Sequence, residues 1–256
     1  MFQDTAYYIS LTLGVVVFAV GVGGNVAWWL SGTGSGQGDS RWARAFPLLR
    51  RAVPLIFRRR TLGAILVYGL VQRQLWRESR LGWLMSVSFL WGVIVLFFIG
   101  SLTDMLDYYG LVELSKDMGW FALVNELGGL LILLGVVIAL YRRSVQRVPH
   151  LRSGREAWLV LAWLAAIALT GYLVEAARLL YEGVPEGAAR LSFVGYGISR
   201  LGPSWDAAYR QIWWLHWVLA ISLLAYIPYS KLFHALVTPL SIVASYLEER
   251  MGPPGG

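Results

Sequence analysis

Residues 120–141 read WFALVNELGGLLILLGVVIALY, an apolar stretch long enough to cross a membrane as a single helix. A helix needs roughly 20 apolar residues to span about 30 Å of hydrocarbon. Four further stretches share this length and character, which places the predicted spans at about residues 7–30, 82–102, 120–141, 157–180 and 212–237. The sequence therefore predicts an all-α integral membrane protein, a bundle of five transmembrane helices.

The composition of the whole chain agrees with a membrane protein. Of its 256 residues, 57% are hydrophobic and only 14% are charged, whereas a soluble domain is about 45–50% apolar and about 25% charged. So few charges could not cover a soluble surface, which excludes soluble enzymes and disordered chains. The chain has no cysteine, so it holds no disulfide, thiolate zinc site or iron–sulfur cluster of its own.

The positive charge of the chain lies in the connections between the spans. Ten arginines fall between residues 31 and 81 and five more between 142 and 155, whereas residues 103–119 carry one lysine against four acidic residues. By the positive-inside rule the N-terminus lies outside and the C-terminus in the cytoplasm. A nucleic-acid partner is not expected, because such proteins gather their charge on a soluble face.

The connection over residues 31–81 is long, basic and predicted to be cytoplasmic. Its residues 62–71 are apolar but too few to span a membrane, and arginines flank them. This pattern predicts an interfacial amphipathic helix. We expect the chain as a whole, residues 1–256, to form a single membrane domain.

Histidine is scarce, and two of the three histidines lie in the predicted fifth span. His216 and His234 are eighteen positions apart, which is five whole helical turns and about 27 Å along the axis. On one unbroken helix they would share a face, with one imidazole in each leaflet. That is the layout for two stacked haems; the alternative is that both histidines only hydrogen-bond a neighbouring helix or lipid headgroups.

Two pieces of the predicted fifth span carry a resemblance to a known family. LHWVL (215–219) and IPYSKLFH (227–234) resemble the last helix of the respiratory nitrate reductase gamma subunit, a five-helix dihaem cytochrome b. The membrane subunits of heterodisulfide reductase-type and DsrM-type iron–sulfur complexes share this motif. LGVVIALYRR (134–143) and LTGYLVEAAR (169–178) are similar to the iron–sulfur-linked members.

The resemblance implies haem b with His216 and His234 as axial ligands, but the second span departs from the pattern. The family places two further ligand histidines there, and Ser86 and Leu96 stand at the matching positions. Three alternatives follow. The haems are lost; or a haem persists on one histidine alone or with a thioether such as Met85 opposite; or a partner chain supplies the missing ligand.

The resemblance also implies a quinone or menaquinone site near the outer end of the bundle. The family uses a lysine in the loop between the second and third spans, and Lys116 is the one lysine in that loop. Its ammonium group would hydrogen-bond a quinone carbonyl, and His216 would contact the same pocket. The plain alternative is a solvated loop lysine.

Charged side chains inside the predicted spans are functional candidates by default, because an unpaired charge in hydrocarbon is costly. Glu175 and Arg178 are three residues apart on one helix face. We expect a structural salt bridge between them rather than a proton relay. Glu126 and Asn125, early in the third span, receive the same structural interpretation.

The resemblance implies a membrane-anchor subunit of a redox complex in a prokaryotic cytoplasmic membrane. The chain would exchange electrons between the quinone pool and a cytoplasmic iron–sulfur or flavin oxidoreductase. This partner would dock on the basic face of the chain, which would also contact membrane lipids. It would then be a non-catalytic or quinone-reactive subunit. The alternatives are a cofactor-free structural anchor or assembly subunit, and a small transporter or channel, which the lack of an internal repeat disfavours.

Overall fold

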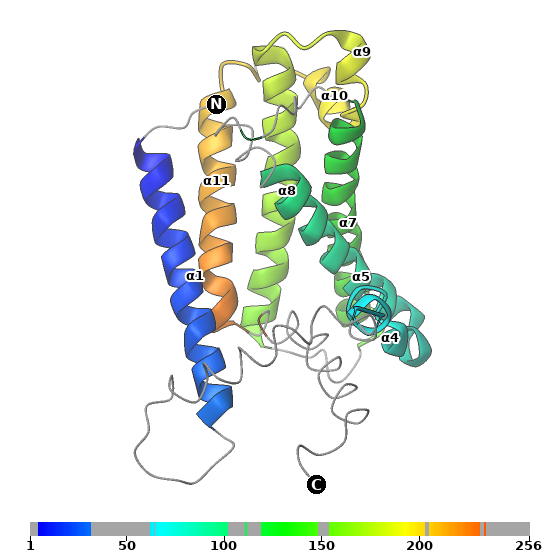
Figure 1. Cartoon of the computed structure of the whole chain (residues 1–256). Helices are drawn as coiled ribbons and strands as arrows, with labels where there is room; N and C mark the ends of the chain where they lie inside the picture. The colour runs from blue at the N-terminus through cyan, green and yellow to red at the C-terminus, as the bar shows by residue number, and fades with distance from the viewer. Residues whose placement is uncertain are drawn as a thin grey trace, which may run out of the picture. The chain divides into compact units, whose positions relative to one another are not determined.

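The computed structural model describes residues 5–31, 62–63, 65–101, 111, 119–147, 154–202, 205–230 and 233. These residues form helices and connections, and no strand occurs within these ranges. The long helices are α1 (Thr5–Ser31), α5 (Arg80–Ile94), α7 (Gly119–Ser144), α8 (Arg155–Tyr181) and α11 (Tyr209–Tyr226) (Figure 1). The shorter elements are η1 (Ile65–Leu70), α4 (Arg73–Glu78), η2 (Val95–Ser101), α9 (Glu186–Ala189), α10 (Phe193–Ser199) and η4 (Ile227–Tyr229).

Among the described residues, five helical segments are long and apolar enough to cross a membrane, which confirms the predicted all-α membrane fold. They run over Thr5–Asn25, Arg80–Phe97, Trp120–Ser144, Arg155–Tyr181 and Tyr209–Tyr229. The second span begins two residues earlier than predicted because Ser79 caps it, its hydroxyl accepting the Gly82 amide at 3.2 Å. The placement of the N-terminus outside stays a prediction.

The fifth span is not one unbroken helix through residue 234, and this part of the prediction is wrong. The α-helix α11 ends at Tyr226, the 3₁₀ turn η4 follows, and Ser230 is extended (φ −116°, ψ 169°). Pro228 explains the break, because proline has no N–H for the helical ladder. Helical periodicity therefore does not place His216 and His234 on one face, and His234 lies outside the described residues.

The predicted interfacial segment at residues 62–71 is not one continuous α-helix. Its described part contains the π-helical turn η1, and the short α-helix α4 follows it. Its position at the membrane surface stays a prediction.

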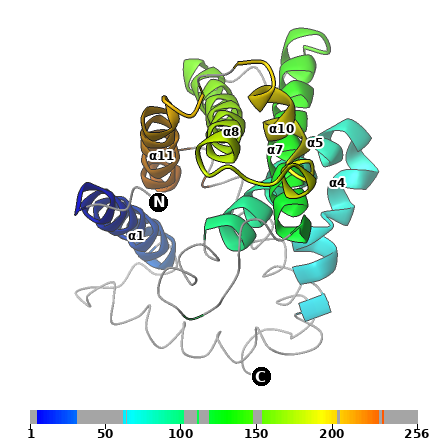
Figure 2. The same ribbon diagram turned by 90° about the horizontal axis from the view of Figure 1, so that it is seen from above.

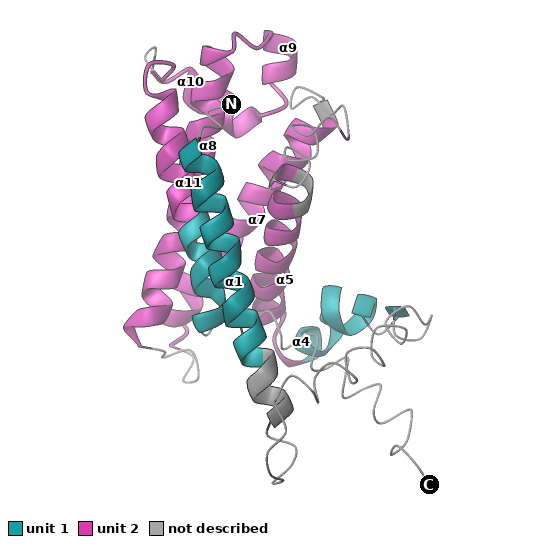
Figure 3. Cartoon of the chain, turned by 60° about the vertical axis from the view of Figure 1, so that its left-hand side comes forward, with its two compact units in different colours: residues 1–77, 221–256 teal, residues 78–220 magenta. Residues whose placement is uncertain are grey.

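The chain divides into two compact units, which are drawn in different colours in Figure 3. Unit 1 takes residues 1–77 and 221–256, and unit 2 takes residues 78–220. Unit 2 therefore contains α5, η2, α7, α8, α9, α10 and the first part of α11. The prediction of a single domain stays a prediction, and each unit is described by itself.

Within unit 2, glycines allow α5 and α7 to pack closely. A β-carbon placed at Gly92 would lie 2.8 Å from Ile132 Cδ1 and 3.1 Å from the Gly128 carbonyl oxygen. One placed at Gly128 would lie 2.7 Å from Val95 Cγ1. Small residues at such crossings let helix backbones approach within the membrane. Viewed from above, α7 lies between α5 and α8 (Figure 2).

The apolar core of unit 2 forms where α5, α7 and α8 meet. Val136 and Ala139 of α7 and Leu161 of α8 are buried there, and Met85 and Phe89 of α5 pack against them. Farther along α8, Trp163 Nε1 donates a hydrogen bond to the Leu219 carbonyl of α11 at 3.0 Å. In unit 2, α8 therefore packs against α7 on one side and contacts α11 on another.

Within unit 1, the first and last spans are held together by polar contacts. Asn25 Nδ2 donates to the carbonyl of Gly21, one turn earlier, at 2.9 Å and to the Pro228 carbonyl at 2.8 Å. Tyr229 donates its hydroxyl to the Val17 carbonyl at 3.0 Å. Gly21 is needed for the close approach, since a β-carbon there would lie 2.5 Å from Pro228 Cβ.

Candidate functional site

His216 projects from α11 onto α8, where two residues fix its ring. Its Nδ1 lies 3.1 Å from Thr170 Oγ1, and a β-carbon at Gly171 would come within 3.2 Å of its Cε1. The Thr170 hydroxyl donates its single hydrogen to the Ala166 carbonyl at 2.7 Å, so toward His216 it acts as an acceptor. This network favours the imidazole proton on Nδ1, with the lone pair on Nε2.

A histidine whose Nδ1 is held by a hydrogen bond and whose Nε2 carries the lone pair suits two kinds of chemistry. Metal-ligating histidines have their other ring nitrogen hydrogen-bonded in this way. The same nitrogen also accepts a hydrogen bond from the hydroxyl of a ligand. His216 alone therefore does not distinguish a haem site from an organic ligand site, and the residues opposite it must decide.

The second span does not fit the haem coordination of the resembled family. Ser86 and Leu96 stand where opposite ligands would be, and Leu96 packs against α7, its Cδ2 3.0 Å from a β-carbon placed at Gly128. Met85 packs against the α5–α7–α8 core. The residues present in the second span thus do not fit a bis-histidine haem.

We expect the reduced protein to lack the split alpha band of a bis-histidine b-type haem. The physical reason is that neither serine nor leucine can replace imidazole as an iron ligand. The measurement is the oxidised-minus-reduced visible spectrum of the protein purified from haem-replete cells, with His216→Ala as the comparison. A split alpha band that disappears in His216→Ala would contradict this expectation.

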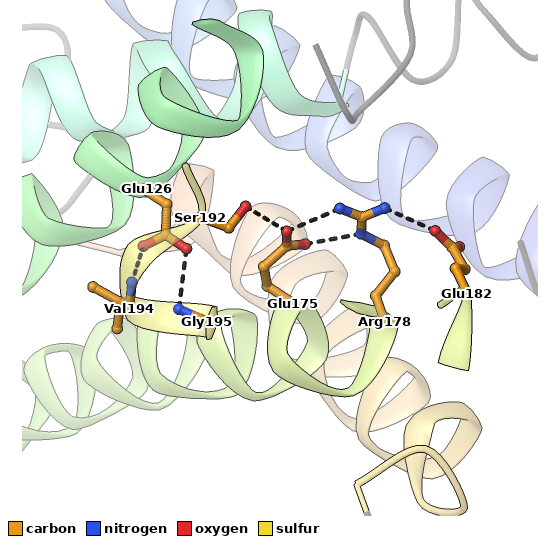
Figure 4. Close-up of polar contacts among 7 residues, drawn as sticks. All are labelled: Glu126, Glu175, Arg178, Glu182, Ser192, Val194 and Gly195. Atoms are coloured by element: carbon orange, nitrogen blue, oxygen red, sulfur yellow. Dashed lines mark hydrogen bonds and ion pairs between the residues drawn. The ribbon is translucent and has the colours of Figure 1, made fainter. Parts of the chain in front are cut away.

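A second group of buried polar residues lies where α7, α8 and α10 meet (Figure 4). Glu126 of α7 is only 4% exposed. Its carboxylate accepts the backbone amides of Val194 at 3.3 Å and Gly195 at 3.2 Å, both in the first turn of α10. The hydroxyl of Tyr172 on α8 donates to the Glu126 carbonyl at 2.8 Å.

Arg178 joins this group through a bidentate pair with Glu175 on α8. Its Nε and Nη2 donate to the two Glu175 oxygens at 3.0 and 2.9 Å, and its Nη1 donates to Glu182 at 2.7 Å. Ser192 donates to Glu175 at 2.7 Å. The predicted Glu175–Arg178 salt bridge is therefore present. We call the seven residues drawn in Figure 4 the carboxylate clasp: Glu126, Glu175, Arg178, Glu182, Ser192, Val194 and Gly195.

The polar groups of the carboxylate clasp are hydrogen-bonded to one another, which indicates a structural role. Buried carboxylates are tolerated when amide, hydroxyl and guanidinium donors surround them. Gly195 is required at its position, since a β-carbon there would lie 2.7 Å from Glu175 Cγ. The clasp therefore fastens the α8–α11 connection, with its short helices α9 and α10, onto the ends of α7 and α8.

The structure brings together only part of the predicted site. Lys116 and His234 lie outside the described residues, so the predicted quinone and haem pairs stay predictions. Within the described ranges no group of three or more His, Cys, Asp or Glu residues could hold a metal ion. Sequence reasoning missed Thr170, Ser192 and Gly195, whose roles depend on contacts distant in the chain.

Comparison with known protein families confirms the resemblance carried by the fifth span. The sequence model of the nitrate reductase gamma subunit family matches residues 71–250, well over half of the chain. The chain belongs to this family. The residues that match the nitrate reductase gamma subunit family contain α5, α7, α8 and α11, whereas α1 precedes them.

Curated relatives of this gamma-family chain are oxidoreductase proteins. The EtfAB:quinone oxidoreductase of Syntrophomonas wolfei is 27% identical over 71% of this chain and 27% of its own length. The probable iron–sulfur-binding oxidoreductase FadF of Bacillus subtilis is 28% identical over 73% of this chain and 27% of its own. A subunit of the dihydromethanophenazine:CoB–CoM heterodisulfide reductase of Methanosarcina mazei is 24% identical over 93% of this chain and 91% of its own.

The chain spans about a quarter of the length of the first two relatives and nearly all of the heterodisulfide reductase subunit. No solved structure matches the gamma-family chain.

Proposed function

We propose that this gamma-family chain is the membrane subunit of an oxidoreductase complex and exchanges electrons between a redox partner and the quinone pool. The family match over residues 71–250 carries the proposal. It is supported by relatives that are named a quinone oxidoreductase, an iron–sulfur-binding oxidoreductase and a subunit of heterodisulfide reductase.

The redox centres of such a complex belong to a partner. The chain has no cysteine, so iron–sulfur clusters would have to be bound by a neighbouring subunit. A flavin subunit would serve equally well. The arginine-rich residues 31–81 and 142–155, predicted to face the cytoplasm of a prokaryotic cell, supply positive charge for docking an acidic partner surface.

The quinone site is proposed at Lys116 and His216. The ammonium group of Lys116 donates a hydrogen bond to one quinone oxygen. His216 accepts from a quinol hydroxyl through Nε2, because Thr170 occupies Nδ1 at 3.1 Å. The two side chains would thus bind and orient the headgroup, while a carrier supplied by a neighbouring subunit would pass the electrons from this outer site to the redox centres of the cytoplasmic partner.

We expect Lys116→Ala to raise the KM for quinol about tenfold, because one charge-assisted hydrogen bond is lost. The measurement is quinol-dependent reduction of an artificial acceptor by the assembled complex. Lys231→Ala is the matched control, since Lys231 is the second lysine of the chain and is predicted on the opposite side. Equal kinetics for wild type and Lys116→Ala would remove Lys116 from the site.

A cofactor-free structural anchor is the second candidate, favoured by the second span. Ser86 and Leu96 replace the histidines through which the resembled cytochromes hold haem. One preparation distinguishes the two candidate functions. A redox partner that co-purifies with the chain but shows no quinol-dependent activity supports the structural anchor. Quinol-dependent activity that requires the chain supports the electron-exchanging subunit.

A further inference from the structure

Glu126 differs from the other charged members of the carboxylate clasp because no cation contacts it in the described part of the chain. Its carboxylate accepts the backbone amides of Val194 and Gly195, at 3.3 and 3.2 Å. Glu175, by contrast, forms a bidentate pair with Arg178. Glu126 is only 4% exposed, and burial without a counter-charge favours the neutral, protonated form of a carboxyl group.

The side chains of Glu126 and Glu175 approach each other at Gly195. Glu175 Cγ and Glu126 Oε1 lie 2.7 and 3.3 Å from the β-carbon position of Gly195. Two carboxylates this close repel each other. Because Arg178 neutralises Glu175, the proton that relieves the repulsion binds to Glu126.

Few other titratable side chains in the described ranges face Glu126 from the helices packed against α7. Tyr172 of α8 donates its hydroxyl to the backbone carbonyl of Glu126 at 2.8 Å. In α10 the titratable residue is Tyr196, whose hydroxyl donates to Glu186 at 2.6 Å. In α5 and η2 it is Arg80, at the start of α5 and far from η2. Glu175 is therefore the charged group that acts on the Glu126 carboxyl group.

The carboxylate clasp and His216 lie along the same face of α8, within unit 2. A β-carbon at Gly171 would lie 3.2 Å from His216 Cε1, and Glu175 is four residues farther along the helix. Residues at this spacing are neighbours on a helix surface, with β-carbons about 5–6 Å apart. A quinol hydroxyl bound by His216 would therefore release its proton about one helical turn from the clasp.

The carboxylate clasp also connects Glu126 with the surface of the protein. Figure 4 shows Glu126, Glu175, Arg178 and Glu182 in a row. Glu182, at the end of this row, accepts a hydrogen bond from Arg178 at 2.7 Å, and its side chain is 43% exposed. A proton bound at Glu126 thus has a polar route out of the apolar span.

We propose that Glu126 accepts the protons released when quinol is oxidised, an inference that rests on the function proposed above. Oxidation of one quinol to quinone releases two electrons and two protons. The electrons pass, through the carrier of a neighbouring subunit, to the iron–sulfur or flavin centre of the partner. Each proton in turn converts the Glu126 carboxylate to the carboxylic acid and then leaves toward Glu182, which restores the carboxylate for the next proton.

The test is the pH profile of quinol oxidation by the assembled complex with an artificial acceptor. We expect the wild-type kcat to rise with pH as Glu126 loses its proton, because only the carboxylate accepts one. Glu126→Gln should remove this rise and lower kcat about a hundredfold, the scale of a positioned proton acceptor. The KM for quinol should not change, because Glu126 does not touch the headgroup. Glu186→Gln, at a side chain that is 55% exposed, should behave as the wild type does.

Glu126→Asp distinguishes proton acceptance from a structural role. Glu126→Gln keeps one oxygen for the α10 amides but takes up no proton. Glu126→Asp is one methylene shorter, so it holds both amides less well, yet it still takes up a proton. We expect the Asp variant to have a higher kcat than the Gln variant and a shifted pH midpoint. A purely structural role predicts the reverse order of kcat, which would overturn the inference.

Two further results separate this inference from the proposed function. A wild-type kcat and pH profile in Glu126→Gln, or an unchanged pH midpoint in Glu126→Asp, would overturn the role of Glu126 alone. The Asp variant decides by itself if the Gln variant does not assemble. A wild-type complex without quinol-dependent activity would overturn the proposed function, and the role of Glu126 with it.

Discussion

Glu175→Ala should lower the free energy of unfolding by about 3 kcal/mol, because it leaves a buried guanidinium without its bidentate partner. Arg178 is 5% exposed and would retain only Glu182, whose side chain is 43% exposed. The loss should also release Ser192 and loosen the α8–α11 connection. The measurement is the unfolding midpoint in detergent, together with protease cleavage between residues 182 and 202.

Two controls distinguish the buried charge from general damage. Arg190→Ala removes a partner of the exposed Arg190–Glu186 pair, in which the side chains are 67% and 55% exposed, and should leave the midpoint unchanged. The double variant Glu175→Ala/Arg178→Met should recover part of the loss, because both charges are then absent. A double variant as unstable as the sum of its single changes would show that the pair itself contributes little.

Gly92→Leu should destabilise unit 2 by about 3 kcal/mol, since overpacking a tight helix crossing forces backbones apart. A β-carbon at this position already meets the Gly128 carbonyl oxygen at 3.1 Å, and a backbone atom cannot turn away as a flexible side chain can. The measurement is again the unfolding midpoint in detergent.

The matched control is Gly24→Leu in α1, where a β-carbon would meet nothing within 4 Å. We expect this variant to be neutral or slightly more stable, because glycine is about 0.8–1 kcal/mol less favourable than alanine in a helix and leucine ranks next to alanine. Equal destabilisation at both glycines would show that the α5–α7 approach is looser than described.

The helices were predictable from sequence because span length is a local property. The third span begins at Trp120, as the apolar pattern predicts, and the second and fourth begin within two residues of their predicted starts. The end of the fifth helix was not predicted, although Pro228 lies within the IPYSKLFH motif. The two-histidine periodicity there favours a continuous helix, and the missing N–H of proline overrides it.

The site was predictable only where its contacts are local in sequence. Glu175 and Arg178 are three residues apart, so their pairing follows from helix geometry. Glu126 instead binds amides 68 and 69 positions later, and His216 meets Thr170 46 positions earlier. No pattern in a single sequence specifies such partners, because they depend on which helices pack together and on the fold of a connecting loop.

The hydrogen bond from the Asn25 side-chain amide to the Pro228 carbonyl has a consequence for the biosynthesis of the chain. The two residues are 203 positions apart, so the first span leaves the ribosome long before its partner exists. During that interval the Asn25 amide, placed in the apolar first span, still has the Gly21 carbonyl of its own helix as an acceptor. Because this local hydrogen bond satisfies the amide, the first span can remain in the bilayer before the last span is made. The hydrogen bond to Pro228 forms only after the last span has been inserted.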